Sequence, residues 1–349
     1  MFVKFSDLKN PLSWDRILGM KIKVFSKSDI KQAISMEQAI AVLRDAFIQL
    51  SAGKAKVPLR SAISIGKHSG QTLFMPAYLE ESDVLGAKIV SVFPGNKKNQ
   101  LPSIHALVIL IDARSGTPLA ILDGTYLTAL RTGAVSGLAT ELLARKNGRV
   151  VAIFGAGVQG RTQLEAVCSV RRIEKVWVYD LDHKASEGFV ADMRSHGQPI
   201  PPQILVAHTP AEAIREADIV CAATTSSKPV FSDSDIRIGT HINGVGSFTP
   251  EAQEIPPETV LRAKVVVDSR EAALVEAGDL VIPLHKGTIS PSHIYAEIGE
   301  LAAGKLPGRE SRQELTFFKS VGLAIQDVAV ASFVLQQGEK LRLGIEIEI

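Results

Sequence analysis

A glycine-rich turn in the middle of the chain has the composition of a phosphate-binding loop. The strand-like run VVAIF leads into Gly155, Gly157 and Gly160, which are spaced G-x-G-x-x-G, and a helix-like run, RTQLEAVCSV, follows. In this context the first glycine permits a tight turn, the second lets the backbone approach a pyrophosphate, and the third lets helix and strand pack closely. The free N–H groups at the start of the helix favour phosphate. The sequence therefore predicts a dinucleotide site in this loop, which also contains Val158 and Gln159.

An acidic residue stands where a dinucleotide site needs one. The next strand-like run, VWVYD, ends in Asp180, about 20 residues after the last glycine of the loop. A carboxylate there accepts hydrogen bonds from the adenosine ribose and repels a 2′-phosphate. We therefore expect NAD(H) as the preferred cofactor. His183 and Lys184 lie nearby and could offset the repulsion, so NADP(H) stays open. The alternative for the whole pattern is a structural turn in an unrelated α/β fold.

The rhythm of the elements predicts two domains. From the glycine-rich strand onward, short apolar runs alternate with helical or turn segments, which is typical of a Rossmann-type doubly wound parallel sheet. We place this α/β domain at residues 130–320. Residues 1–129 with 321–349 are expected to form a second, α+β domain. Within it, residues 57–124 alternate β-rich runs with Gly, Pro and Asn, which predicts an antiparallel sheet.

Two further segments complete the second domain. Residues 30–50 carry apolar side chains at helical spacing and predict an amphipathic helix. The C-terminal GIEIEI alternates strictly, and we expect it to join the antiparallel sheet. The first 20 or so residues are assigned no function.

Composition excludes several classes of protein. The chain has 349 residues, a net charge of +2, 22% charged and 46% hydrophobic residues, which is ordinary for a folded domain and unlike a disordered one. The near-neutral balance gives no reason to expect a nucleic acid partner. The run ALVILI is too short to span a membrane. Two cysteines, far apart in sequence and outside any metal-ligand spacing, predict no metal site and, without a secretory leader, a reducing cytoplasmic setting.

Several stretches resemble the ornithine cyclodeaminase/μ-crystallin family. They are FMPA, GAKIVSVFPGN, LTALRTGA, GAGVQG, HINGVG and TFFKSVGLAIQDVAVA, and the resemblance runs from about residue 30 to the end. It implies an NAD(P)-dependent oxidoreductase acting on an amine or imine by hydride transfer. It also implies a homodimer, in which the substrate domains join through their β-sheets and the nicotinamide cofactor lies on the Rossmann domain.

The resemblance assigns three cations to the substrate. Arg60, Lys88 and Arg131 match family positions that bind the carboxylate of an amino or imino acid, and a guanidinium can bind a carboxylate through two bonds. Lys88 stands between small and apolar residues of a predicted strand, and would also polarise an imine or give it a proton. His105 is the second candidate proton donor. The alternatives are a surface arginine, a solvent-facing lysine, a solvated helix charge and a packing histidine.

Other matched positions are expected around the cofactor. They are Ser103, Arg131, Thr132, Thr224, Asn243, Val245, Gly246 and Val321. Those after residue 220 mostly follow predicted strands, and the carboxyl ends of strands are where open α/β sheets bind ligands. Asp327 is expected to position a helix rather than to catalyse.

The chain departs from the cyclodeaminase pattern at one place. Phe248 stands where the cyclodeaminase has its catalytic aspartate, and the neighbouring Ser247 is a poor base. We therefore expect reduction of a preformed cyclic imine, Δ1-pyrroline-2-carboxylate or Δ1-piperideine-2-carboxylate, to L-proline or L-pipecolate. Ornithine cyclodeaminase and alanine dehydrogenase are alternatives within the family. A μ-crystallin-like protein that binds a small ligand without turnover is the alternative of another class.

Overall fold

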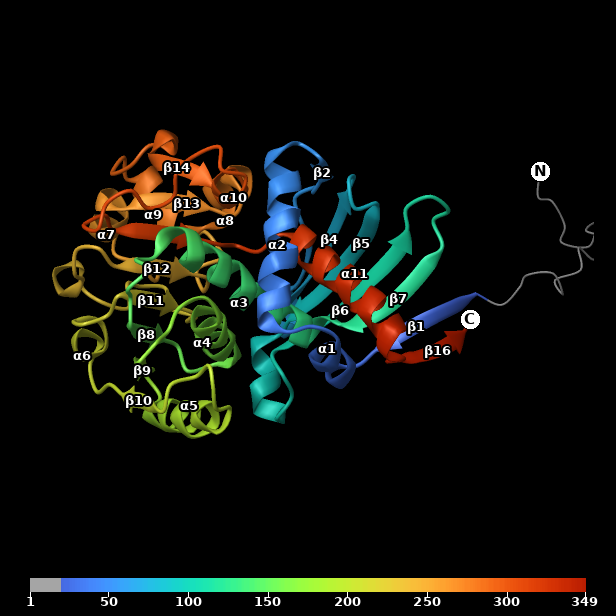
Figure 1. The fold of residues 1–349 in the computed structure, drawn as a ribbon, viewed down its shortest axis with the longest axis horizontal. Helices are drawn as coiled ribbons and strands as arrows, with labels where there is room; N and C mark the ends of the chain where they lie inside the picture. The colour runs from blue at the N-terminus through green and yellow to red at the C-terminus, as the bar shows by residue number, and fades with distance from the viewer. Residues whose placement is uncertain (1–19) are drawn as a thin grey trace, which may run out of the picture.

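Two eight-stranded sheets organise the molecule (Figure 1). The computed structural model describes residues 20–349, and the segment 1–19, to which we assign no function, lies outside the described residues. One sheet with its covering helices forms the left side of Figure 1 and the other forms the right side. Helices α2 and α3 lie near the middle, and α11 runs across the right-hand sheet, on which it packs. The expected fold class is confirmed.

The first sheet is parallel throughout and has the Rossmann arrangement. In spatial order its strands are β10 (Gln203–Val206), β9 (Lys175–Tyr179), β8 (Val150–Phe154), β11 (Ile219–Ala222), β12 (His241–Gly244), β15 (Thr316–Lys319), β13 (Lys264–Val267) and β14 (Ile294–Glu297). The winding reverses between β8 and β11. Such a switch point opens a crevice at the carboxyl ends of the strands, where ligands bind.

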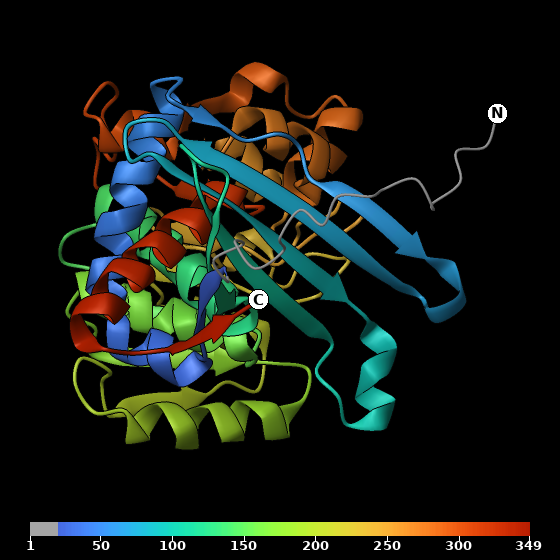
Figure 2. The ribbon, with the colours of Figure 1, turned by 90° about the vertical axis from the view of Figure 1, so that its right-hand side faces the viewer.

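The second sheet is mostly antiparallel. Its order is β16 (Ile345–Glu348), β1 (Lys21–Phe25), β7 (Pro118–Asp123), β6 (Ile104–Asp112), β5 (Val84–Val92), β4 (Gly70–Leu79) and β2 (Ala55–Lys56), and β3 (Ser61–Ile65) also pairs with β4. Only β1 and β7 run parallel among its pairs within the described residues. The C-terminal strand β16 pairs with β1, so the expectation for GIEIEI is confirmed. In Figure 2 the β3–β4 hairpin and the short 3-10 helix after β5 (Pro94–Asn99) project away from the helices.

Eleven α-helices are present in the described part of the chain. They are α1 (Lys27–Ala33), α2 (Met36–Ser51), α3 (Gly124–Leu143), α4 (Val158–Val170), α5 (His183–Ser195), α6 (Pro210–Ile214), α7 (Pro257–Arg262), α8 (Arg270–Glu276), α9 (Gly278–His285), α10 (Ile298–Ala302) and α11 (Ala324–Leu341). The predicted helix over 30–50 is therefore two helices. The first ends at Ala33, with Ile34 as its C-cap, and Ser35 caps the second. The hydroxyl of Ser35 accepts from the amide of Gln38, while the side chain of Gln38 accepts from the amide of Ser35. None of the described helices has the length and apolarity needed to cross a membrane.

Helix α3 belongs to both halves of the molecule. Its small residues allow close crossings: a Cβ on Gly133 would lie 2.5 Å from the carbonyl oxygen of Thr162 in α4, and one on Gly137 would lie 2.6 Å from Ile40 in α2. The helix is buried along most of its length. The domain boundary predicted after residue 129 falls inside α3, because a helix with no solvent-facing stripe packs on neighbours from both sides.

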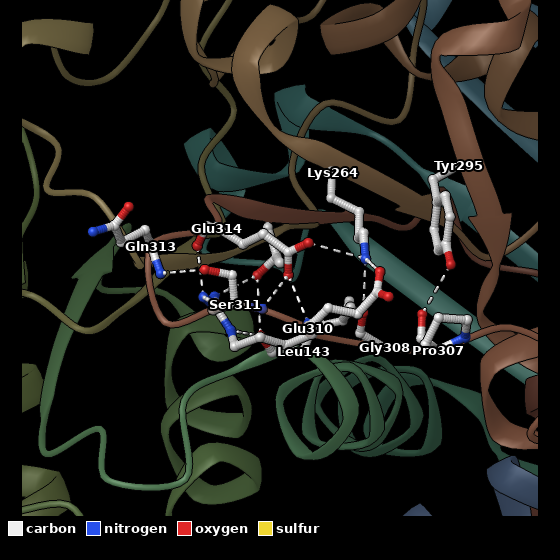
Figure 3. A network of polar contacts seen from close by, with 11 residues as sticks. Leu143, Lys264, Tyr295, Pro307, Gly308, Glu310, Ser311, Gln313 and Glu314 are labelled. Atoms are coloured by element: carbon white, nitrogen blue, oxygen red, sulfur yellow. Dashed lines mark hydrogen bonds and ion pairs between the residues drawn. The ribbon is translucent and has the colours of Figure 1, made fainter.

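A polar network anchors the loop before β15 next to the end of α3 (Figure 3). Lys264 at the start of β13 donates to the carbonyl of Gly308 at 2.9 Å and pairs with Glu310 at 2.7 Å and Glu314 at 3.1 Å. Arg309 in the same loop donates to the carbonyl of Leu143, the last residue of α3. The network therefore attaches the carboxyl end of α3 to the parallel sheet.

Candidate active site

A buried carboxylate joins two of the expected substrate cations. Asp327 in the first turn of α11 places Oδ2 2.8 Å from Nζ of Lys88 and Oδ1 3.0 Å from Nε of Arg131. Lys88 comes from β5 and Arg131 from α3, so three elements meet at this carboxylate. All three side chains are almost completely buried. Removing one partner would leave a buried charge without compensation, which is costly.

Lys88 points to the covered face of the antiparallel sheet. Gly86, Lys88 and Val90 are the buried positions of β5, because alternate side chains of a strand share one face, and α11 packs on that face. Burial, and next the nearby guanidinium of Arg131, lower the pKa of Lys88 to about 8, although Asp327 opposes the shift. Lys88 is therefore protonated at neutral pH and gives up its proton more readily than an exposed lysine, which suits a general acid.

The chain between β15 and α11 crosses directly over Arg131. Gly322 has φ +82°, and a Cβ on it would lie 2.6 Å from Nη1 of Arg131, so only glycine allows this crossing. The amides of Val321 and Gly322 each donate to Oδ2 of the buried Asp268 at 2.9 Å. Arg131 also donates through Nη1 to the side-chain oxygen of Gln326. The crossing segment and the guanidinium are thus held in one arrangement.

Arg60 lies in the loop between β2 and β3 and reaches the other half of the molecule. Its Nε donates to Oε1 of Glu276 at 2.7 Å, and its Nη2 donates to the second carboxylate oxygen. Nη2 also lies 3.4 Å from the carbonyl oxygen of Val321, to which it donates. Glu276 is the last residue of α8. The two-bond ion pair therefore connects the substrate half to the Rossmann half.

Among the ion pairs of the site, cations outnumber carboxylates by one. Three cations, Arg60, Lys88 and Arg131, are paired with two carboxylates, Glu276 and Asp327. A cavity of about 190 Å³ opens beside Arg60 between the two halves of the molecule. Its lining includes Val57, Arg60, Met75, Glu276, Gly322 and Leu323. Because drug-sized ligands need about 300–1,000 Å³, the cavity suits a small anion.

The glycine-rich loop has the geometry expected for a dinucleotide. Gly155 has φ +98°, and a Cβ on it would lie 2.5 Å from the carbonyl oxygen of Ala223. A Cβ on Gly160 would collide with the carbonyl of Gly155, whereas the space beside Gly157 is open. Gly157 caps α4, and no side chain covers the first-turn amides that begin at Val158. Open space and free amides together form a cradle for phosphate.

Asp180 shapes the neighbouring part of the cradle. Its Oδ2 accepts from the amide of Ala156 at 2.8 Å and its Oδ1 accepts from the amide of Asp182 at 3.0 Å. The carboxylate thus lies at the carboxyl end of β9, beside the glycine loop. His183 stacks on His208 with ring centroids 5.3 Å apart. This places an imidazole pair at the beginning of α5, close in sequence to the acid that would contact the ribose.

Two of the expected cofactor residues have a buried polar atom without a hydrogen-bond partner in the described part of the chain. Oε1 of Gln159 in the first turn of α4, and the hydroxyl of Ser103 just before β6, have no hydrogen-bond partner in the described residues. Buried polar atoms are almost always paired, so such atoms mark places where a ligand supplies the missing bond. Together with the open cradle, they fit a bound dinucleotide.

A second buried carboxylate aligns the strand ends that follow the switch point. Oε1 of Glu254 accepts from the amide and hydroxyl of Thr224 at 2.6 and 2.8 Å, and Oε2 accepts from the amides of Gly246 and Ser247 at 2.7 and 3.0 Å. The amide of Val245 donates to the carbonyl oxygen of Ala222, the last residue of β11, at 2.9 Å. Thr224, Val245 and Gly246 therefore lie together at the ligand-binding edge.

His105 does not lie with the substrate cations. The antiparallel register of β5 and β6 sets Lys88 opposite Val108 and Ser91 opposite His105. His105 is three residues from Val108, so its side chain points to the other, exposed face of the sheet. This corrects the expectation of a shared pocket and leaves Lys88 as the group placed to deliver a proton.

Two expected cofactor residues have their side chains inside the protein. Asn243 donates to the hydroxyl of Thr140 in α3 at 2.9 Å, and its oxygen lies 3.1 Å from Nε2 of His241. Thr132 donates its hydroxyl to the carbonyl of Thr128 within α3 at 2.8 Å. These side-chain bonds connect α3 to the parallel sheet and stabilise the helix, and cofactor contact by Asn243 and Thr132 stays a prediction.

Three acids of the site were not assigned a functional role from the sequence. Asp327 carried a visible signal, because a carboxylate within the apolar run AIQDVAVA must be paired. Glu254 and Glu276 carried none, since each stands in a segment that already contains other polar residues. Their roles depend on partners far away in the sequence.

A Rossmann sheet with an open dinucleotide cradle, facing a cationic pocket, defines a nicotinamide-dependent oxidoreductase of small anionic substrates. The model of the ornithine cyclodeaminase/mu-crystallin family matches residues 20–340. The chain belongs to this family.

Individual relatives match over nearly the whole chain. It is 40% identical over 327 residues to a Δ1-pyrroline-2-carboxylate reductase of Bacillus cereus, covering 93% of this chain and 99% of the relative. A Thermococcus litoralis Δ1-pyrroline-2-carboxylate reductase, solved with NADH and L-proline, is 45% identical with a TM-score of 0.90, covering 93% and 100%. An archaeal alanine dehydrogenase, solved as a dimer with NAD, is 38% identical with a TM-score of 0.88, covering 95% and 100%.

Proposed function

We propose that this protein reduces a cyclic α-imino acid, Δ1-pyrroline-2-carboxylate or Δ1-piperideine-2-carboxylate, to L-proline or L-pipecolate, with NADH as the preferred reductant. The observation that carries the proposal is the group of three cations paired with only two carboxylates, where the substrate half meets the Rossmann half. One further carboxylate balances the third cation. Similarity to two reductases of Δ1-pyrroline-2-carboxylate supports the substrate class.

The residues of the chain would anchor the acid and supply the proton. Arg60 and Arg131 present guanidinium groups to the substrate carboxylate. The reduced nicotinamide, when bound, supplies the hydride that adds to the carbon of the C=N bond. Nζ of Lys88 gives a proton to the imine nitrogen, so that the C=N bond becomes CH–NH with charge and atoms balanced. Asp327 acts as a positioning residue, because it holds the ammonium and one guanidinium together.

Deamination of ornithine suits this pocket less well. Phe248 is half-buried in the loop after β12 and cannot move a proton. The hydroxyl of Ser247 is bound between Lys319, whose Nζ is 2.6 Å away, and Asp279. The acids that pair with the cations, Glu276 and Asp327, are each bound to them. An aromatic side chain at the loop would instead suit a flat ring.

The direct test is NADH oxidation with a panel of substrates. We expect turnover with one or both cyclic imino acids and a lower kcat/KM with NADPH. If only pyruvate plus ammonia is turned over, the proposal is wrong and the protein is an alanine dehydrogenase. Formation of proline and ammonia from ornithine would replace it with a cyclodeaminase.

A ligand-binding protein without turnover is distinguished by Lys88→Ala. For an enzyme we expect kcat to fall by about 10²-fold or more, with the Kd for NADH unchanged, because Lys88 lies in the substrate pocket and not in the glycine loop. A binding protein would have no turnover to lose and would bind its ligand as before. Tryptophan-to-NADH energy transfer gives the Kd independently of catalysis.

We also propose a homodimer formed through the exposed face of the antiparallel sheet. Phe74, Ile89 and Leu107 lie directly opposite one another on β4, β5 and β6 and point away from the covered face. An apolar row of this kind on a sheet is typical of an interface. The dimer of the similar alanine dehydrogenase supports the proposed homodimer.

Two unpaired buried cysteines, Cys168 and Cys221, support a reducing, cytoplasmic setting for the protein.

A further inference from the structure

The ion pair between Arg60 and Glu276 occupies the position that a substrate carboxylate would take. Nε and Nη2 of Arg60 donate to the two oxygens of Glu276, which is the two-bond arrangement that an arginine forms with any carboxylate. The pair borders the cavity of about 190 Å³ between the two halves of the molecule. Glu276 is thus an internal carboxylate bound in a substrate pocket.

Arg60 has no second edge free for a substrate. A guanidinium offers five N–H groups, and a two-bond contact uses either Nε with Nη2 or Nη1 with Nη2. The two hydrogens of Nη2 are taken by Glu276 and by the carbonyl of Val321, 3.4 Å away. Only Nη1 has no hydrogen-bond partner within the described residues. Two-bond binding of a substrate carboxylate through Nε and Nη2, the edge with the short bonds, therefore requires Glu276 to leave. Binding through Nη1 and Nη2 instead requires the longer contact with the carbonyl of Val321 to break.

The two acids of the pocket differ in their freedom to move. Asp327 has a side chain with 0% exposure and is held by both Lys88 and Arg131. Glu276 has a side chain with 16% exposure and is the last residue of its helix. When it is released, its carboxylate can be solvated at the mouth of the cavity. Asp327 is consequently a fixed counter-ion and Glu276 a replaceable one.

We propose that Glu276 is a specificity-determining residue: the substrate carboxylate must displace its side chain from Arg60. This inference rests on the proposed function, and refines it. A ligand with a well-placed carboxylate exchanges one ion pair for another. A neutral imine, or an anion that cannot form two bonds, does not compensate for the free energy of the lost Arg60–Glu276 ion pair and therefore binds poorly. Glu276 thereby weakens binding of all ligands at Arg60 and sharpens selection among them.

The test is Glu276→Gln, which keeps the size of the side chain and removes its charge. Because the substrate carboxylate no longer has to break a charged pair, we expect KM for the imino acid to fall about 10- to 150-fold, which corresponds to the roughly 1.5–3 kcal/mol of a hydrogen bond between charged groups. The Kd of L-proline, measured by calorimetry in the presence of NAD+, should fall by a similar factor. Inhibition by acetate should strengthen, and the Kd of NADH should not change.

The chain offers a matched control in the same helix. Glu271 also lies in α8 and lines the same cavity, but makes no contact with Arg60. Glu271→Gln removes the same charge, so any general change of electrostatic potential appears in both variants. We expect Glu271→Gln to lower KM much less than Glu276→Gln does, because an exposed charge that makes no pair contributes little.

Each outcome decides between two arrangements. A KM and a Kd of L-proline that rise, or that match those of Glu271→Gln, would overturn the proposal, since Glu276 would then orient Arg60 instead of competing for it. If no imino acid is turned over, the proposed function fails. Calorimetry then still tests whether a carboxylate displaces Glu276 from Arg60, by comparing the Kd values of L-proline, pyruvate and acetate in the two proteins. If none of these carboxylates binds the Glu276→Gln variant more tightly than the unchanged protein, the proposal that a substrate displaces Glu276 is wrong.

Discussion

At the scale of single residues, the proposed reaction depends on a lysine whose surroundings oppose its charge. Lys88 is buried and close to Arg131, and only Asp327 stabilises its ammonium form. The protonated form is the one that both attracts a carboxylate and donates a proton. The pH at which it loses that proton therefore sets the alkaline limit of the reaction.

Lys88 predicts a specific pH profile. Its pKa of about 8 lies below the ordinary value of 10.5, so the active ammonium form is present below that pH and lost above it. We expect kcat/KM for imine reduction to be level below about pH 8 and to fall up to about tenfold per pH unit above it. In Lys88→Arg the side chain stays charged, so we expect kcat/KM to be lower overall and to show no fall near pH 8. A break near 10.5 in the original protein would contradict the assignment.

Asp180 predicts the basis of cofactor choice. Asp180→Ser removes a charge that would repel a 2′-phosphate, so we expect the ratio of kcat/KM for NADPH to that for NADH to rise about tenfold or more. Asp182→Ser is the matched control, because Asp182 lies two residues away and caps α5 through the amide of Lys184 at 3.0 Å. An equal shift in both variants would exclude Asp180 as the selective residue.

Residues whose roles depend on local context could be predicted from the sequence. The glycine loop needs only its own strand and helix, and its three glycines take the expected conformations. The partners of Arg60 and Arg131 could not be predicted, because Glu276 and Asp327 lie about 200 residues further along the chain. The face on which His105 lies follows from strand register, which a single strand does not reveal.

At the scale of elements, the segment that crosses between the two halves of the molecule depends on one glycine. Gly322 combines a positive φ with the close approach of Arg131. For Gly322→Ala we expect a loss of unfolding free energy of about 1–3 kcal/mol and a higher KM for the imino acid, because the guanidinium must shift. Thermal melting and steady-state kinetics measure the two effects.

A second glycine separates backbone strain from the contact with Arg131. Gly304 also has a positive φ, +69°, but a Cβ on it would meet nothing within 4 Å. Gly304→Ala should therefore show only the cost of the left-handed conformation, about 1–2 kcal/mol, with KM unchanged. Equal effects of the two substitutions on KM would show that the crossing over Arg131 is not required for substrate binding.

Most elements could be predicted because their patterns are local. The run VVAIF became β8 with the predicted bounds, and GIEIEI supplies β16, which joins the antiparallel sheet as predicted. The domain boundary could not be predicted, because α3 is apolar and small-residue-rich without a polar stripe. Such a helix is buried on all sides, and its own residues do not reveal which elements pack against it.

At the scale of the whole molecule, the exposed row on the antiparallel sheet predicts the quaternary structure. Leu107→Glu places a charge at the centre of the proposed interface, so we expect the dimer to dissociate in light scattering at micromolar concentration. Leu261 provides the control: it is 50% exposed, against 51% for Leu107, but belongs to α7 in the Rossmann half. Leu261→Glu should remain dimeric. A dimeric Leu107→Glu would place the interface elsewhere.

The long helix α3 has a consequence for the kind of acid that can react. It carries Arg131 near the substrate half, and at its other end Thr140 binds Asn243 of the parallel sheet and Leu143 binds Arg309. The proposed anchor for the acid group thus belongs to the same helix that is hydrogen-bonded to the parallel sheet, on which we expect the reductant to bind. The span between the anchored acid and the reacting carbon is therefore set before any ligand arrives. An imine one carbon further from its acid group would present the wrong atom for reduction, whatever the size of its ring.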